Sequence, residues 1–292
     1  LQDLTGDGGV LKEWLRPGTG DVVPPFASVA VKLSGYLGNW NNPFCSHGHD
    51  NCPKLMKLGK DITLWGLELG LQSMSRGELA RFVLSPAYAY GPRGCPPFIP
   101  PDTTVLFEVE LLHFIDSEEH DAFLELTEEQ QDTFPLEKVL KVAATEREFG
   151  NYFFHNQNFV AAKDRYKNAL SILGRRSVSE AEQNQLNASK MPLLLNLSLT
   201  YLRLKCPEQA LKYGKKALEM DQGNAKALFR CGQACLCMKE FIQSRDFLTR
   251  AQRIQPFNPD INNELKKLAM CYEEYLEAQR EMCTRMFQHL NS

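Results

Sequence analysis

The chain has 292 residues, of which 43% are hydrophobic and 24% are charged, and its formal net charge at pH 7 is −3. This composition is typical of a globular protein with room for two domains, and it excludes a disordered or fibrous chain. A net charge so near zero gives no overall attraction to nucleic acid or to an anionic membrane, so we expect neither as a direct partner.

The cysteines and the lack of long apolar runs predict the cellular compartment of the protein. No run of about 18 apolar residues is present, and the first ten residues are too polar for a signal peptide. Cys231, Cys235 and Cys237 are three of nine cysteines and lie close together in a helical pattern, which is typical of reduced core thiols rather than of a disulfide framework. We therefore expect a soluble protein of the cytoplasm, with the nucleus open as a second compartment.

The first part of the chain, residues 1–115, has the pattern of a sheet. Short β-like runs at 28–33, 79–84 and 103–112 are separated by Gly and Pro, and the last run alternates apolar and polar residues. Residues 61–74 have apolar side chains at helical spacing. This part is predicted to be an α+β domain in which a twisted antiparallel sheet packs on one short helix.

An acidic segment at 116–134 follows this domain. It contains eight Asp and Glu residues between Asp116 and Asp132, and no Lys or Arg. We interpret it as a solvated linker with a partly docked stretch. A docking site for a basic partner is the alternative.

The rest of the chain carries a helical repeat. The segments 162–170, 210–218 and 244–252 can be superposed; Ala217 and Ala251 are 34 residues apart, whereas Ala169 and Ala217 are 48 apart, which leaves an insertion of 14 residues. A period of 34 with small residues at helix crossings is typical of tetratricopeptide repeats, so an all-α repeat domain is predicted. Its parts are repeat one at 135–176, the insertion at 177–190, repeat two at 191–224 and repeat three at 225–258.

Two further features of the repeat region concern helix ends. Pro192 is expected near the start of a helix, where its missing N–H does no harm. Residues 259–292 are predicted to form a long amphipathic helix that covers the apolar face of the last repeat. A membrane-binding or calmodulin-binding role for this helix is the alternative, although its acidic and basic residues are balanced.

Four stretches of the first domain resemble the FKBP-type immunophilins: SGYL at 34–37, LGKDITLWGLELGLQSMSRGELA at 58–80, SPAYAYG at 85–91 and IPPDTTVLFEVELL at 99–112. The resemblance implies a half-barrel sheet around one helix, with an apolar cleft between them. In this family the cleft binds an X–Pro peptide and lowers the roughly 18–20 kcal/mol barrier to rotation of the imide bond. The aromatic, water-poor wall of the cleft suits the twisted imide.

Position by position, the resemblance implies that the cleft has lost its activity. Residues that match the family lining are Phe44, Tyr90, Ile99 and Phe107, and residues that depart from it are Leu33, Cys45, Lys54, Leu67 and Cys95. Leu67 stands where the family has the indole of the cleft floor, and Trp65 lies two residues earlier on another face of the helix. We therefore predict an inactive isomerase homologue with no catalytic residue. A working isomerase with an unusual cleft, and a cleft that binds peptide without turnover, are the alternatives.

A short loop carries four possible zinc ligands, Cys45, His47, His49 and Cys52. Their number and type suit a tetrahedral zinc site. The loop is too tight to aim all four inward, and its remaining residues are ordinary turn formers. We predict neither a metal nor another cofactor, and a zinc-dependent interaction module is the alternative.

Polar residues recur at groove positions of the repeats. Arg147 and Asn151 are spaced i, i+4 on one expected helix, as are Lys226 and Arg230 on another, and Asn196 lies on the helix between them. Such cations and amides suit a terminal carboxylate and an acidic side chain of a peptide. The five residues resemble the dicarboxylate clamp of co-chaperones that hold the acidic C-terminal tail of heat-shock protein 90 or of its seventy-kilodalton counterpart. Arg147 departs from the usual Lys, which keeps the charge and changes the geometry.

The leading hypothesis is a chaperone-associated scaffold. The repeats would hold the chaperone tail, and the first domain would contact a client protein that the sequence does not identify. For family members that pair one degenerate isomerase domain with three repeats, the resemblance also implies a germ-cell setting with roles in meiosis and small-RNA (piRNA) pathways. The alternative is an active peptidyl-prolyl cis-trans isomerase tethered to the chaperone.

Overall fold

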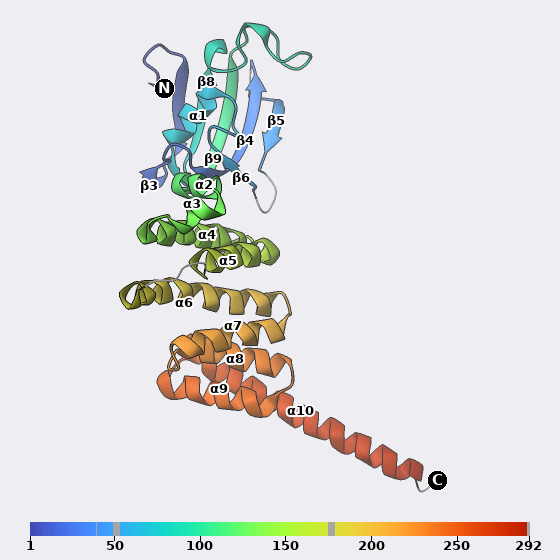
Figure 1. Cartoon of the computed structure of the whole chain (residues 1–292). Coiled ribbons are helices and arrows are strands. Elements are labelled where there is room, and N and C mark those ends of the chain that lie inside the picture. The colour runs from blue at the N-terminus through green and yellow to red at the C-terminus, as the bar shows by residue number, and fades with distance from the viewer. Residues whose placement is uncertain (39, 49–52, 175–178, 291–292) are drawn as a thin grey trace. The chain divides into compact units, whose positions relative to one another are not determined.

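The computed structural model describes residues 1–38, 40–48, 53–174 and 179–290, and no statement concerns the side chains of 287–290. The chain divides into two compact units, Leu1–Phe134 and Pro135–Ser292. Figure 1 shows that the first unit contains the sheet and that the second consists of helices. In the described part of the chain, no helix combines the length and the apolar character needed to cross a bilayer.

The first unit is built on an antiparallel sheet of seven strands in the order β1-β2-β8-β9-β4-β5, with β6 also paired to β4. The strands of this sheet are β1 (Gln2–Asp3), β2 (Val10–Arg16), β4 (Ser28–Leu37), β5 (Pro43–His47), β6 (Leu55–Lys57), β8 (Leu79–Leu84) and β9 (Val105–Ile115). A separate pair is formed by β3 (Thr19–Val22) and β7 (Ser75–Arg76). The longest pairing joins β4 to β9, where Ser28 lies opposite Ile115 and Leu37 opposite Val105. The predicted strands at 28–33, 79–84 and 103–112 are therefore confirmed.

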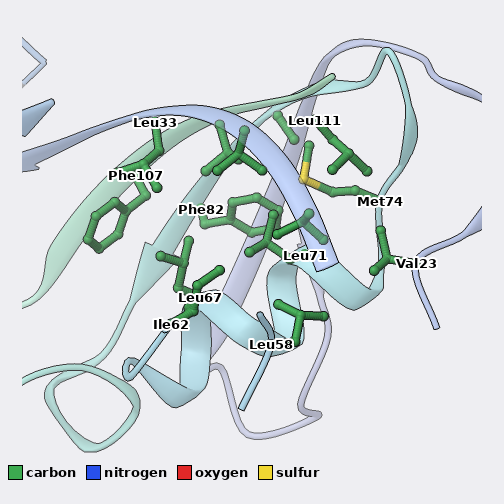
Figure 2. Close-up of a cluster of buried hydrophobic side chains, with 14 of the residues drawn as sticks. Val23, Leu33, Leu58, Ile62, Leu67, Leu71, Met74, Phe82, Phe107 and Leu111 are labelled. Carbon is green, nitrogen blue, oxygen red and sulfur yellow. The ribbon is translucent and has the colours of Figure 1, made fainter. Parts of the chain in front are cut away.

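One helix, α1 (Trp65–Gln72), packs into this sheet, and two 3₁₀ turns, η1 (Pro86–Tyr88) and η2 (Gly91–Arg93), follow β8. Figure 2 shows Leu67 and Leu71 of α1 directed at Phe82 on β8, and all three side chains are at least 95% buried. Gly70 makes this approach possible, because a Cβ there would lie 2.9 Å from the Phe82 ring. The α+β fold with one helix against an antiparallel sheet is thus confirmed.

The acidic segment at 116–134 is more ordered than a linker. It forms α2 (Glu118–Leu124) and α3 (Glu128–Asp132) within the first unit. Ser117 bonds to Ser28 at 2.9 Å, and Lys57 forms an ion pair with Asp121. Phe123 is buried and meets Phe134 edge to face. A lysine of the sheet domain thus pairs with one of the acids. The stretch that docks is α2, which buries His120 and Phe123, whereas no residue of α3 is buried.

The second unit consists of paired helices. The helices are α4 (Leu136–His155), α5 (Phe159–Gly174), α6 (Glu180–Arg203), α7 (Pro207–Met220), α8 (Ala225–Cys237), α9 (Phe241–Ile254) and α10 (Pro259–Leu290). The small residues predicted at the crossings are fully buried: Ala169, Ala217 and Ala251 each have 0% exposure. Gly150 packs under Tyr166, where a Cβ would lie 2.4 Å from the ring. This confirms an all-α repeat architecture.

Helix α6 corrects two expectations. It begins at Glu180, so most of the predicted insertion at 177–190 is helical and extends the first helix of repeat two. Pro192 therefore lies inside the helix rather than near its start. Proline cannot donate the backbone hydrogen bond to residue 188, which leaves that carbonyl without its helical partner.

The last helix and one cysteine also differ from expectation. On α10, Ile261 and Leu268 are buried against the third repeat, but the side chains from Glu277 to Met286 are exposed, so only the first part of the helix acts as a cap.

Cys231 and Cys235 are buried free thiols as predicted, whereas Cys237 is exposed. Burial raises the pKa of Cys231 to about 12 and that of Cys235 to about 11.

Candidate functional site

The cleft residues that match the family lie together in the first unit. Phe44 meets Tyr90 and Phe107 edge to face, with ring centroids 6.3 and 6.0 Å apart. Ile99 is buried in the same apolar cluster. Gly35 leaves the space for this group, because a Cβ there would lie 2.7 Å from Phe44 and 2.9 Å from Phe107. A remnant of an aromatic wall is therefore present.

The floor of the cleft is aliphatic. Leu67 is 5% exposed and belongs to the core, as does Leu33 on β4, and Figure 2 shows Leu33 beside Phe107. The indole of Trp65 is 58% exposed at the start of α1, on a different face from Leu67. Lys54 is exposed to solvent. Leu67, rather than the indole of Trp65, thus belongs to the core, in agreement with the helical spacing of the sequence.

Cys45 and Cys95 lie near Tyr90, the tyrosine of the cleft that matches the family. Cys45 on β5 is half-buried and Cys95 is exposed. Burial raises the pKa of Cys45, and burial together with the two nearby thiols raises the pKa of Tyr90. Both groups are therefore neutral at neutral pH. The thiol of Cys45 stands where the resemblance to the family implies an acid.

The zinc hypothesis can be followed only in part. Cys45 and His47 lie on β5, whereas His49 and Cys52 fall outside the described residues. Among the residues that the structure does describe, no group of three potential ligands could hold a metal ion.

The five clamp residues lie on the first helices of the three pairs. Arg147 and Asn151 are on α4, Asn196 is on α6, and Lys226 and Arg230 are on α8. In the part of the chain that the structure describes, none of the three cations is within ion-pair distance of a carboxylate. Arg230 instead donates to Oε1 of Gln233 at 3.0 Å and lies 5.5 Å from the centroid of the Phe229 ring, so these charges are not neutralised by an ion pair among the described residues.

Asn151 and Asn196 form one hydrogen-bonded unit with Tyr166 of α5. Oδ1 of Asn151 accepts from the Tyr166 hydroxyl at 2.8 Å and from Nδ2 of Asn196 at 3.2 Å. Burial raises the pKa of Tyr166 to about 12, although a hydrogen bond with Asn196 and the charge of Arg147 oppose the rise. The tyrosine is thus a fixed neutral donor. Because the Asn151 oxygen is occupied, its amide N–H groups remain for an anionic ligand.

Lys226 and Arg230 share a cavity of about 380 Å³ with Asn196. Its apolar floor includes Leu195, Leu199, Phe229 and Ile261. Burial, followed by the charge of Arg203, lowers the pKa of Arg230, while Asp260 on the cavity wall raises it. Even so, an arginine remains protonated at neutral pH. A half-buried cation above an apolar floor favours a carboxylate attached to an apolar chain.

Arg147 lines a second cavity, of about 220 Å³, between α4 and α6. Pro192 lines both cavities, so the two hollows adjoin at this residue. The second cavity also contains Ala188 and Ser189, which belong to the helical extension of α6. The structure thus brings Asn196, Lys226 and Arg230 into one cavity, joins Asn196 to Asn151, and places Arg147 at the adjoining hollow.

Sequence reasoning missed three residues of this groove. The sequence gives no sign that the phenol of Tyr166 orients Asn151. Pro192 is expected near a helix start, and Asp260 falls within the predicted last helix without a role of its own. Asp260 could be identified as a groove residue from the sequence, because it lies in the first turn of the helix that follows the third repeat. The role of Tyr166 depends on a contact with a residue 15 positions away, so no local sequence pattern indicates it.

Known proteins share parts of this sequence and fold. The FKBP-type peptidyl-prolyl cis-trans isomerase family matches residues 21–112. The TPR-containing C-terminal domain of an FK506-binding protein from Plasmodium falciparum covers 51% of this chain and 99% of its own, with a TM-score of 0.46 and 24% identity.

Two relatives match nearly the whole chain. The inactive peptidyl-prolyl cis-trans isomerase FKBP6 of Equus caballus is 62% identical over 98% of this chain and 91% of its own, and that of Homo sapiens is 62% identical over 98% and 88%. These names confirm the prediction of an inactive isomerase homologue. The chain belongs to the FKBP6 family of inactive FKBP-type peptidyl-prolyl cis-trans isomerases.

Proposed function

We propose that the chain is a chaperone-associated scaffold whose repeat groove binds the acidic C-terminal tail of heat-shock protein 90. The observation that carries this proposal is the shared cavity of Asn196, Lys226 and Arg230, joined through the Asn196–Asn151 hydrogen bond to the first repeat. Amide donors together with Lys226 and Arg230, which form no ion pair within the described residues, suit a terminal carboxylate, an acidic side chain and an aliphatic side chain of one extended peptide.

The first domain serves in this proposal as a binding module. Phe44, Tyr90 and Phe107 still form an aromatic wall, while the indole floor and the acid beside Tyr90 are missing. Such a surface can hold a peptide of a client protein without lowering the barrier to rotation of its imide bond. The proposed setting is the cytoplasm, with the nucleus as a second compartment, in germ-cell meiosis and small-RNA (piRNA) pathways.

Calorimetry with synthetic tail peptides tests the groove. Lys226→Ala and Arg230→Ala should each weaken binding about tenfold or more, because a charge-assisted hydrogen bond contributes roughly 1.5–3 kcal/mol. Lys212→Ala is the matched control, since Lys212 is exposed on α7 and lines neither cavity. Unchanged affinity in both cavity variants would refute the clamp. Tighter binding of the tail of the seventy-kilodalton chaperone would instead reassign the partner.

A further inference from the structure

The hollow beside Arg147 has a lining that the five clamp residues do not account for. Its volume is about 220 Å³, and residues of α4 and α6 form its walls. Leu140, Ala143 and Leu193 give it an apolar floor, in which Ala143 and Leu193 are buried. Arg147 is half-buried at the same hollow. A few polar groups above an apolar floor are typical of a pocket that binds a ligand.

A backbone acceptor lies at the wall of this hollow. Pro192 is inside α6 and has no N–H, so the carbonyl of Ala188 lacks its helical donor. Ala188 and Pro192 both line the hollow, which places the carbonyl between them at its wall. Ser189 adds a hydroxyl, which can donate or accept a hydrogen bond. The hollow thus offers a cation, a hydroxyl and a carbonyl without its helical partner to one ligand.

The position of Pro192 is unfavourable for the helix itself. Proline is the residue least suited to a helix interior, because it removes a hydrogen bond and its ring crowds the preceding turn. The turns of α6 before Pro192 belong to the 14-residue insertion, so the repeat period does not require them. Departures from local preference of this kind are expected mainly where a functional site uses them.

We propose that the hollow binds one further residue of the peptide held in the neighbouring cavity, and that it does so through the backbone of that residue. The N–H of the residue donates to the carbonyl of Ala188, its C=O accepts from Arg147 or Ser189, and its aliphatic side chain lies on the apolar floor. This inference rests on the proposed clamp. Pro192 lines both cavities, so an extended peptide that fills one can continue into the other.

A peptide unit suits this hollow better than a free anion does. A carboxylate or a phosphate presents acceptor oxygens, and the carbonyl of Ala188 would repel them. A peptide unit presents a donor and an acceptor together, which matches a wall that contains an acceptor beside donors. The ligand is therefore a longer peptide than the clamp alone requires, with an aliphatic residue next to its acidic residues.

Calorimetry with tail peptides of increasing length tests this inference separately from the clamp. The peptides are lengthened one aliphatic residue at a time, at the N-terminus in one series and past the C-terminus in the other. We expect affinity to rise about five- to tenfold at the residue that reaches the hollow, and N-methylation of its amide should remove the gain. If length makes no difference, the inference is overturned and the clamp stands. If no peptide binds, the clamp itself fails.

Two variants of the chain change the hollow directly. Pro192→Ala supplies an N–H to the carbonyl of Ala188, so it should remove the gain from the added residue and raise the midpoint of thermal unfolding. Ala144→Leu fills the hollow from an exposed position on α4 and should remove the gain with an intact circular dichroism spectrum. Pro207→Ala is the control, because Pro207 lies in the first turn of α7 and frees no helical carbonyl. A gain that survives both changes to the hollow would contradict the inference.

Discussion

The side-chain amide of Asn196 on α6 donates to Oδ1 of Asn151 on α4 across 3.2 Å, and the hydroxyl of Tyr166 donates to the same oxygen across 2.8 Å. One acceptor thus fixes two amides of the groove from two successive repeats. The N–H groups of Asn151 are the part of its amide that remains for a ligand, because its oxygen already accepts two hydrogen bonds.

Tyr166→Phe should show whether peptide binding depends on the orientation of the Asn151 amide as well as on the charges of the groove. We expect the free energy of unfolding to fall by about 1 kcal/mol, the net contribution of one hydrogen bond, and tail-peptide binding to weaken several-fold although no cation changes. Denaturant unfolding and calorimetry measure the two effects. Tyr213→Phe on α7 is the control, since this half-buried ring stacks on Tyr201 and lines neither groove cavity. A loss of stability with unchanged affinity would show that Asn151 needs no orientation.

The sequence predicts well the features that depend on a regular spacing of apolar or small residues along the chain. Helical spacing alone separates Leu67 from Trp65, and the structure buries the first and exposes the second. Alternation likewise locates β9, and the 34-residue period locates the crossings at Ala217 and Ala251. Positions four apart on one helix share a face whatever surrounds the helix, which is why Lys226 and Arg230 could be paired.

The features that the sequence misses depend on contacts between distant segments. The acidic run resembles a solvated spacer until Lys57, more than sixty positions from Asp121, is seen to approach it. Pro192 is compatible with a helix start, and only the turns that precede it show that α6 began earlier. The amphipathic pattern of α10 indicates a buried face, but it does not say that only the first part meets its own repeat.

Gly150→Ala tests the crossing of α4 and α5. A Cβ at this position would lie 2.4 Å from the ring of Tyr166, which is 2% exposed and cannot move away easily. We expect a loss of about 1–3 kcal/mol from overpacking, more than the gain of roughly 1 kcal/mol in helix propensity. Gly174→Ala is the control, because no atom of the described residues lies within 4 Å of a Cβ there, and it should not destabilise. Thermal unfolding of both variants measures the difference, and equal midpoints would contradict the crossing.

The ion pair of Lys57 with Asp121 should make the docking of α2 depend on pH. Burial opposes ionisation, but hydrogen bonds from Lys57 and His120 hold the pKa of Asp121 below its ordinary value. A lowered pKa contributes stability above the unfolded value of about 3.9, and that contribution is lost as the pH falls through the folded pKa.

Asp121→Asn should therefore cost roughly 0.5–1 kcal/mol near neutral pH, a small effect because the side chain is 36% exposed. The difference from the unchanged chain should vanish in acid, where both carry a neutral side chain. Urea unfolding at the two pH values measures it. Glu125→Gln, an exposed acid on the same segment, should show no such dependence; a cost that persists unchanged in acid would mean that the charge of Asp121 is irrelevant.

Leu67→Trp asks whether the missing indole alone explains the inactive cleft. Leu67 is 5% exposed among Leu71 and Phe82, so the larger ring should lower the free energy of unfolding by about 1–3 kcal/mol. Isomerisation should stay at the uncatalysed rate, because Cys45 still provides no carboxylate for Tyr90. A protease-coupled proline assay measures turnover, with Trp65→Leu as the control for an exposed indole. Turnover by the unchanged chain that disappears in Phe107→Ala would instead show that the aromatic remnant is sufficient for catalysis.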